Sequence, residues 1–312
     1  MKLSIVIPVY NKAQYVVRCL EDLLRQEFDD FEVVCVDDGS TDDSGRLCDE
    51  VAVADPRVRV YHQPNGGVTA ARRLGVEHST GRYVMFVDAD DRLLPGALET
   101  MYSAMETSGA DEVIATYRTH TGVDSPIVYT GLTPVEPLVR AIVTGKSRFP
   151  VLWAVIFRRD ILEGTLQTPR DIVEGEDRLM QLQILMKQPR VFFIPNQVYL
   201  YTADLPNDRR RTLQREQHYD NLLRQTLRLR WEDYAEAFTL HQLKEYETFV
   251  ARDEATPPVL AYYRSEIKSL PASIPFYDRL VWWLPVWMSR PLIRLYKKLI
   301  MLKLHDEISP QN

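Results

Sequence analysis

Three carboxylates stand within four positions at the end of a short apolar run. Asp88, Asp90 and Asp91 follow Val84–Val87, with Ala89 between the first two. Runs of this kind are typical of buried strands in a parallel sheet, where ligands bind beyond the carboxyl ends. Alternate side chains of an extended segment point to the same side, so Asp88 and Asp90 could converge on one ligand. Because clustered carboxylates repel, the pattern predicts a hard cation such as Mg²⁺ or Mn²⁺ between them.

The third carboxylate has a second interpretation. Asp91 directly precedes a segment expected to begin a helix near Leu94 and Pro95. Aspartate is a favoured N-cap, because its side chain accepts hydrogen bonds from the first free backbone N–H groups. We therefore expect Asp91 to cap this helix.

The elements that would position these residues alternate between strand and helix. Strands are expected over residues 3–9, 31–36, 58–61 and 83–87, and helices over about 13–26, 41–53, 68–77 and 95–107. Polar or glycine-rich residues follow the strands, at 10–11, 37–40 and 88–91. The alternation predicts an α/β fold with a mostly parallel sheet, and it brings the strand ends to one edge where a nucleotide would bind.

The later part of the chain is more irregular and then helical. Further strands are expected over 112–116, 191–194 and 198–201, with a hairpin and a short helix within 118–148. Residues 151–157 suit either a strand or the start of a buried helix, and residues 174–177 open a helix. From about residue 216 the pattern is helical, with an interruption at Pro257-Pro258.

Composition excludes several classes of protein. The 312 residues are 45% hydrophobic and 26% charged, which is ordinary for a soluble globular protein. A net charge of −6 argues against a general nucleic-acid binder. Three cysteines without a CxxC pair favour a reducing compartment, which we expect to be the cytoplasm. We expect neither a signal peptide nor a membrane span.

The C-terminal segment combines aromatic and basic residues. Trp282, Trp283 and Trp287 lie among arginines and lysines, while Pro285 and Pro291 are expected to break any long helix. Such a segment suits the interface of a membrane, here its cytoplasmic face. The alternative is an aromatic helix folded back on the rest of the protein.

Several segments together resemble family 2 glycosyltransferases, the large inverting group with the GT-A fold. They are the opening strand 4–11, the turn 36–42, the segment 65–72, the Asp88-Ala89-Asp90 motif and the pair Glu176-Asp177. Arg73 replaces the asparagine usual in the third segment. The resemblance is strong over 3–95, fair to about 201, and absent from the C-terminal third.

The resemblance implies a domain organisation. Residues 1–208 would form a GT-A, Rossmann-like catalytic domain, with a nucleotide-binding half over 1–95 and an acceptor half over 96–208. Residues 209–312 would form a helical extension, membrane-associating from about 276. The run Asp208–Arg211 with Arg215 corresponds to a flap over the diphosphate in related enzymes, although a solvated charge run is an equal alternative.

The resemblance also assigns the donor site. Asp90 would bind Mn²⁺ or Mg²⁺, with Asp88 beside it on the ribose side. Asp38 would accept a hydrogen bond from uracil N3–H, which favours a UDP-sugar, or it would instead stabilise its own turn. Tyr10 would stack on the base, or simply end a strand. The complete nucleotide-binding set is Pro8, Tyr10, Asp38, Arg72, Asp88, Ala89 and Asp90.

Two further roles have open alternatives. Arg72 would reach the nucleotide or hold in place the acidic edge, which is the group of carboxylates Asp88, Asp90 and Asp91. Otherwise it is a surface charge on its helix. Asp177 would be the general base that activates the acceptor hydroxyl, with Glu176 supporting it. A helix N-terminus favours their ionised forms, but acidic residues are common there whatever the function.

The function implied is inverting, metal-dependent transfer of a hexosyl or N-acetylhexosaminyl group from a UDP-sugar. The acceptor would be a hydroxyl of a glycan or lipid-linked glycan, in polysaccharide or cell-surface glycan synthesis. A non-catalytic nucleotide-sugar binder is the alternative. A nucleotidyltransferase is a weaker one, because no glycine-rich phosphate loop with a following lysine succeeds the first strand.

Overall fold

The computed structural model describes residues 1–202 and 212–308, with side chains described up to residue 299 except residue 297. The chain divides into two compact units. The first contains residues 1–142 and 146–226, and the second contains residues 143–145 and the chain from Leu227 onward. The run at 208–211, considered above as a flap, lies outside the described residues.

The first unit begins with a parallel sheet of four strands in the order β3-β2-β1-β4. These strands are β1 (Leu3–Val9), β2 (Phe31–Asp37), β3 (Val58–His62) and β4 (Tyr83–Phe86). The helices between them are α1 (Val16–Leu24), α2 (Ser44–Ala54) and α3 (Val68–Glu77). This strand and helix alternation follows the sequence pattern closely.

The sheet continues past β4 with mixed pairing. β8 (Val155–Arg158) is antiparallel to β4 and to β6 (Glu112–Thr119), and β9 (Val191–Tyr201) is parallel to β6. β5 (Arg92–Leu93) and β7 (Gly131–Thr133) both pair antiparallel with β9. The remaining helices of this half are α4 (Ala97–Ser108), α5 (Val135–Val143) and α6 (Glu176–Leu185), with the short 3₁₀ helix η1 (Arg159–Leu162). The predicted mostly parallel α/β sheet flanked by helices is confirmed.

Two local expectations were wrong. Residues 191–201 form one strand instead of two. Pro195 cannot donate to the sheet, and the pairing shifts register here, because residues 193–197 of β9 lie opposite only residues 114–116 of β6. Pro291 lies inside a helix and does not break it.

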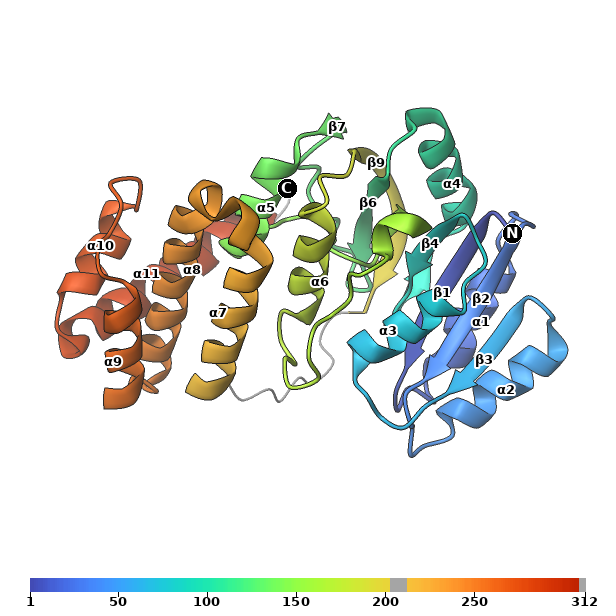
Figure 1. Cartoon of the computed structure of the whole chain (residues 1–312), viewed down its shortest axis with the longest axis horizontal. Coiled ribbons are helices and arrows are strands. Elements are labelled where there is room, and N and C mark those ends of the chain that lie inside the picture. The colour runs from blue at the N-terminus through green and yellow to red at the C-terminus, as the bar shows by residue number, and fades with distance from the viewer. Residues whose placement is uncertain (203–211, 309–312) are drawn as a thin grey trace. The chain divides into compact units, whose positions relative to one another are not determined.

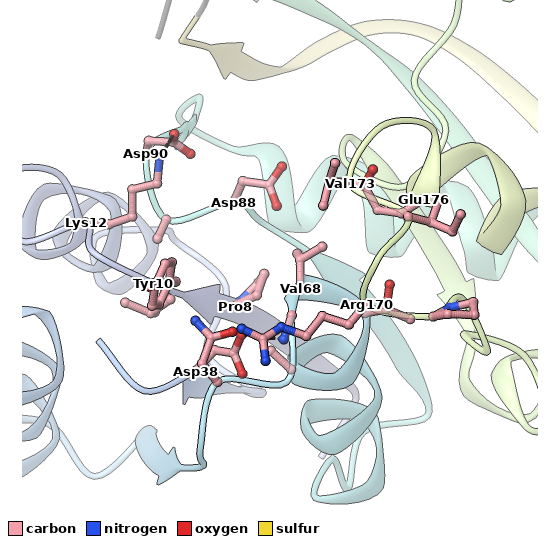
Figure 2. A pocket seen from close by; sticks show the side chains of 18 of the residues that line it. Pro8, Tyr10, Lys12, Asp38, Val68, Asp88, Asp90, Arg170, Val173 and Glu176 are labelled. Atoms are coloured by element: carbon pink, nitrogen blue, oxygen red, sulfur yellow. Dashed lines mark hydrogen bonds and ion pairs between the residues drawn. The ribbon is translucent and has the colours of Figure 1, made fainter. Parts of the chain in front are cut away.

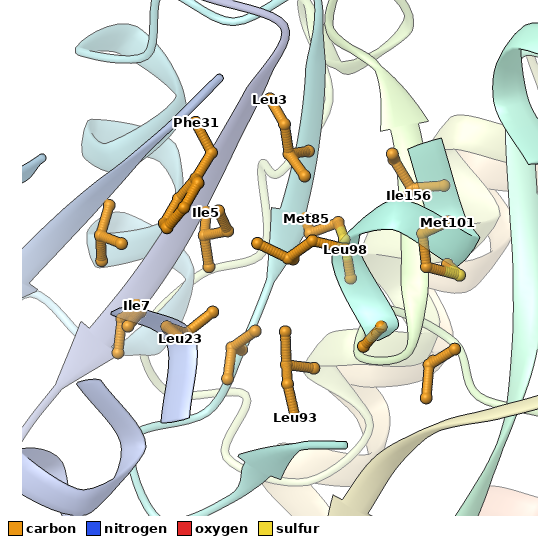
Figure 3. Close-up of a cluster of buried hydrophobic side chains, with 14 of the residues drawn as sticks. Leu3, Ile5, Ile7, Leu23, Phe31, Met85, Leu93, Leu98, Met101 and Ile156 are labelled. Carbon is orange, nitrogen blue, oxygen red and sulfur yellow. The ribbon is translucent and has the colours of Figure 1, made fainter. Parts of the chain in front are cut away.

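Side chains alternate between the two faces of the sheet. Leu3, Ile5 and Ile7 of β1 belong to a core that includes buried residues of α1 and α4 (Figure 3). Val6 points to the opposite face, where α3 packs so closely that a Cβ on Gly75 would lie 2.3 Å from Val6 Cγ1. Helices α1 and α3 therefore cover opposite faces of the sheet (Figure 1).

Helix α7 (Leu213–Leu227) extends the first unit beyond the boundary expected at residue 208. His218 Nδ1 lies 2.6 Å from Asp171 Oδ2. The ring of Tyr219 lies so close to Gly175 that a Cβ there would be 2.9 Å from it. Helix α7 therefore packs against the segment that leads into α6.

The second unit is helical, as expected for the C-terminal extension. Its elements are η2 (Arg228–Arg230), α8 (Trp231–Arg252), α9 (Pro257–Glu266), α10 (Phe276–Trp283) and α11 (Val286–Ile308). Pro257 and Pro258 occupy the first turn of α9, where proline costs no hydrogen bond. In the described part of the chain, no helix is both long and apolar enough to cross a bilayer.

The three cysteines, Cys19, Cys35 and Cys48, belong to the first unit and are buried free thiols.

A buried carboxyl group gives the first unit a testable pH dependence. Glu112 is fully buried, and its Oε1 accepts a hydrogen bond from Gln181 Nε2 on α6 at 2.5 Å. Burial raises the pKa of Glu112 to about 8, despite the opposing effect of this hydrogen bond. The folded state thus binds a proton that the unfolded chain releases above its ordinary pKa of about 4.3. The resulting stability is complete at low pH and is lost as pH rises through the folded pKa.

We therefore predict that Glu112 alone contributes a fall of up to about 1.4 kcal/mol per pH unit to the free energy of unfolding between about pH 5 and pH 8. Glu112→Gln should remove this component, while Glu27→Gln, at an exposed position, should retain it. Urea denaturation at several pH values measures the slope. If the free energy of unfolding had the same slope against pH in the two variants, Glu112 would not be the source of this pH dependence.

Candidate active site

A cleft of about 690 Å³ lies at the carboxyl ends of β1, β2 and β4 (Figure 2). The strand ends contribute Pro8–Tyr10, Lys12, Asp38 and Asp88–Asp90, and Glu176 lies across from them (Figure 2). Its lining residues are Pro8, Val9, Tyr10, Lys12, Asp38, Asn65, Gly67, Val68, Thr69, Ala71, Asp88, Ala89, Asp90, Pro169, Arg170, Ile172, Val173, Glu176 and Arg215. The cleft thus lies where the strand order predicts a ligand.

The cleft brings together most of the residues proposed from the sequence. Those in its lining are Pro8, Tyr10, Asp38, Asp88, Ala89, Asp90 and Glu176. Arg72 and Asp177 do not line it. Tyr10 is 46% exposed, so this aromatic side chain of the lining is accessible to a ligand.

Asp38 holds the glycine loop that follows β3. Its Oδ1 accepts hydrogen bonds from Gly66 N at 2.7 Å and Gln63 Nε2 at 2.6 Å, and its Oδ2 accepts one from Gly67 N at 2.8 Å. Gly67 has φ +89°, a conformation that favours glycine. The carboxylate therefore shapes the loop beside the cleft, and a ligand would share an oxygen that is already hydrogen-bonded.

Arg72 lies behind the acidic edge. It is only 4% exposed, so the surface-charge interpretation is wrong. Its Nη2 donates to Asp88 Oδ1 at 2.8 Å. Burial opposes a charged guanidinium, but the negative charges of Asp88 and then Glu176 outweigh this effect and raise the pKa of Arg72. This geometry matches the alternative in which Arg72 positions the acidic edge.

Asp91 is not a helix cap. Helix α4 begins after Gly96, which makes no side-chain capping bond. Asp91 is buried, and its two oxygens accept hydrogen bonds from Tyr199 Oη at 2.8 Å and Thr202 N at 2.7 Å. Burial, followed by the nearby charge of Asp88, raises the pKa of Asp91 to about 8. Asp91 therefore anchors the loop 88–91 to the end of β9.

Asp90 and Asp88 each use one oxygen for a cationic side chain. Lys12 Nζ lies 2.5 Å from Asp90 Oδ2, while Arg72 binds Asp88 Oδ1. Within the described residues, no group of three His, Cys, Asp or Glu side chains is arranged to hold a metal ion. Mg²⁺ is commonly held by one or two carboxylates together with substrate phosphates. Each carboxylate thus has a second oxygen that Lys12 or Arg72 does not take, and a divalent cation held there would need its remaining ligands from a diphosphate and from water.

The acidic pair opens helix α6 as expected. Gly175, in a left-handed conformation with φ +81°, turns the chain into this helix. Glu176 faces the cleft (Figure 2), whereas Asp177 Oδ1 accepts a hydrogen bond from Arg178 N at 2.8 Å. The sequence placed both carboxylates correctly on a helix start, but it could not tell which one lines the cleft.

Some residues of the site carried no recognisable signal in the sequence. Lys12 follows the opening strand, and Arg170 extends across the cleft towards Asp38 from a segment without a motif (Figure 2). Tyr199 accepts a hydrogen bond from Asp88 N at 3.1 Å and so links β9 to the acidic edge. Only the polar character of Lys12, directly after Tyr10-Asn11, could have marked it.

Comparison with known proteins gives several relatives. GlyG of Streptococcus pneumoniae is 42% identical over 116 residues, which are 37% of this chain and 38% of GlyG. EpsJ of Bacillus subtilis, an uncharacterized glycosyltransferase, is 30% identical over 212 residues, covering 65% of this chain and 61% of EpsJ. The matches thus span less than two thirds of the length of these curated relatives.

Solved structures of S. aureus TarS residues 1–349 resemble the fold. One superimposes with a TM-score of 0.60 at 21% identity, covering 96% of this chain and 92% of TarS 1–349. The same protein in complex with UDP-GlcNAc gives a TM-score of 0.60 at 19% identity. At these identities the likeness concerns the fold.

The family itself follows from a separate match. The model described as glycosyl transferase family 2 matches residues 4–166, a range that contains the strand ends lining the cleft. It covers more than half of the 312 residues. The chain therefore belongs to glycosyl transferase family 2.

Proposed function

We propose that this protein transfers a sugar from a UDP-sugar to a hydroxyl of a glycan or lipid-linked glycan, with inversion at the anomeric carbon. The cleft at the strand ends carries this proposal, because it combines an aromatic side chain, a glycine loop and two adjacent carboxylates. The process served would be polysaccharide or cell-surface glycan synthesis. Family membership and the UDP-GlcNAc complex of TarS support the donor class.

The donor would lie along the strand ends. Tyr10 would stack on the uracil ring, and Asp38 would accept from its N3–H while still holding the glycine loop. Asp88, oriented by Arg72, would face the ribose. Together these side chains would fix the nucleotide before any bond changes.

Asp90, assisted by Asp88, would hold Mn²⁺ or Mg²⁺ beside the diphosphate. Such a cation stabilises the negative charge that the leaving diphosphate gains. Lys12 and Arg170 line the same cleft and bring positive charge to the phosphate region. Glu176 contributes its carboxylate from the opposite side of the cleft, where the sugar and the acceptor would meet (Figure 2).

The acceptor hydroxyl requires a base, because an alcohol is a weak nucleophile near neutral pH. Asp177 would accept its proton as the oxygen attacks in line and the bond to the diphosphate breaks. Glu176 would orient the acceptor from the lining of the cleft. One carboxylate is sufficient for inversion, with no covalent intermediate.

The second unit would attach the enzyme to the cytoplasmic face of a membrane. Phe276 and Trp283 of α10 and Trp287 of α11 are each at least 75% exposed. Arg279 and Arg294 are exposed on the same two helices. Exposed aromatic rings beside basic side chains suit an anionic lipid interface, where a lipid-linked acceptor would be found.

We predict that Asp90→Asn abolishes the increase in UDP affinity produced by Mn²⁺. Removing the charge leaves a neutral amide, which is a weaker ligand for a hard divalent cation. Calorimetric titration of UDP, with Mn²⁺ and with EDTA, measures the increase. Asp29→Asn, at an exposed position, is the matched control and should behave as wild type. A Mn²⁺-dependent increase that survives in Asp90→Asn would refute the ligand assignment.

We predict that Asp177→Asn lowers the rate of UDP release from UDP-GlcNAc by about 10²- to 10⁴-fold. This is the usual contribution of a general base to a reaction rate. UDP affinity should change little, because the base would act on the acceptor hydroxyl and not on the nucleotide. Glu176→Gln is the comparison variant and should reduce turnover less. Near-normal turnover in Asp177→Asn with collapse in Glu176→Gln would transfer the role of base to Glu176.

We predict that the protein cosediments with phosphatidylglycerol vesicles and is released by high salt, which screens the basic side chains. Replacing Trp283 and Trp287 by serine should weaken this binding several-fold. Leu229→Ser changes an 87% exposed residue outside α10 and α11 and should have no effect. Equal sedimentation of all three proteins would argue against an interfacial role for the two tryptophans.

A further inference from the structure

The cleft contains an ion pair between a lysine and the carboxylate proposed to bind a divalent cation. Lys12 Nζ lies 2.5 Å from Asp90 Oδ2, and both side chains line the cleft (Figure 2). Their side chains are 29% and 17% exposed, so the pair is partly shielded from water. Asp90 therefore already has a positive partner supplied by the protein.

The backbone at Asn11 and Lys12 is held in place by the turn after β2 and by the start of α2. Asn11 N donates to Ser40 Oγ at 3.0 Å, and Lys12 N donates to Ser44 Oγ at 2.7 Å. Asn11 has φ +52°, a left-handed conformation that asparagine tolerates better than most residues. Because both backbone N–H groups are hydrogen-bonded, the Cα atom of Lys12 has a defined position just beyond the carboxyl end of β1.

Stability alone gives this ion pair little weight. Partly exposed ion pairs of this kind add little to folding stability, because solvent still screens much of their attraction. Their effect on a charged ligand is larger, since an ammonium group has three N–H donors and no acceptor. Asp90 Oδ2 takes one of these donors, which leaves others for the oxygens of a phosphate.

The charges in the cleft indicate what this ammonium group would do. The lining contains the carboxylates of Asp38, Asp88, Asp90 and Glu176, and the cationic side chains of Lys12, Arg170 and Arg215. An incoming diphosphate adds further negative charge beside Asp90. A divalent cation bound to Asp90 would repel an ammonium group on the same carboxylate at short range. Lys12 and the divalent cation should therefore compete for Asp90.

We propose that Lys12 is a resident counter-cation of the diphosphate site, which gives the enzyme metal-independent affinity for the nucleotide and competes with the divalent cation for Asp90. This inference rests on the proposed function, because it assumes that the cleft binds a nucleoside diphosphate. When a divalent cation takes Asp90, the lysine is released from that carboxylate and keeps its contact with the phosphate oxygens.

The first test is a titration of the full chain with UDP, once in EDTA and once with saturating Mn²⁺. Wild type should bind UDP under both conditions. Lys12→Met should weaken binding on the order of tenfold in EDTA, as expected for loss of a hydrogen bond to a charged group. With Mn²⁺ the loss should be smaller, because the metal then supplies the positive charge.

Two further variants control for charge and for the substitution itself. Lys12→Arg keeps the charge and should retain binding in EDTA. Lys146→Met changes an exposed lysine that does not line the cleft and should match wild type under both conditions. Circular dichroism and thermal unfolding of each variant establish that the proteins are folded.

A second measurement follows Mn²⁺ itself, without nucleotide and without turnover. The electron paramagnetic resonance signal of free Mn²⁺ reports how much metal the protein binds. Lys12→Met should bind Mn²⁺ several-fold more tightly than wild type, because Asp90 then has no competing ammonium group. Unchanged or weaker Mn²⁺ binding in Lys12→Met would overturn the competition.

The outcomes separate this inference from the proposed function. The inference is overturned if Lys12→Met binds UDP as wild type does in EDTA, or if it loses affinity equally under both conditions. If wild type binds UDP only with Mn²⁺, the inference about Lys12 is also overturned, but the proposal that the donor is a UDP-sugar is not. Wild type that binds UDP under neither condition refutes the donor assignment, and the inference with it.

Discussion

The repulsion among carboxylates at the end of β4 is the constraint on which the rest of the site depends. Asp88, Asp90 and Asp91 lie within one short loop, so each needs a partner that offsets its charge. The three solutions differ. Asp88 has a buried guanidinium behind it, Asp90 has a lysine ammonium in the cleft, and Asp91 is buried against the end of β9 with a raised pKa. The loop thus has one anchored carboxyl group, that of Asp91, and two carboxylates that line the cleft.

These partners come from elements that the fold brings to the same edge. Arg72 belongs to α3, which packs tightly on β1 because Gly75 leaves no Cβ between the helix and Val6. Lys12 follows β1, and its backbone N–H donates to Ser44 at the start of α2. Tyr199 comes from β9, whose place in the sheet depends on the mixed pairing beyond β4. The geometry of the acidic edge is therefore a consequence of packing across the whole first unit.

The sequence was sufficient to predict the strands and helices whose local residue pattern agrees with their burial in the fold. Strands that are apolar throughout and helices with regular periodicity were predicted close to their observed bounds, because burial on both sheet faces imposes that pattern. The helix-cap prediction for Asp91 failed because a tertiary partner, Tyr199, lies 108 positions away. Lys12 was missed for a similar reason, since its partner Asp90 is 78 positions away and neither residue type is unusual where it stands. Arg72 was correctly singled out, but only its burial decided among its alternatives.

Residues that line the cleft differ in role from residues that act on it through a neighbouring side chain. Asp38 uses its carboxylate to hold the glycine loop, so it would act on a nucleotide through the shape of that loop as well as by the direct contact proposed. Arg72 is buried behind Asp88 and orients a carboxylate without lining the cleft. Lys12 lies in the cleft itself, where it pairs with Asp90. A lysine and a divalent metal that compete for one carboxylate would give the enzyme two routes to the same charge balance, with the metal concentration deciding between them.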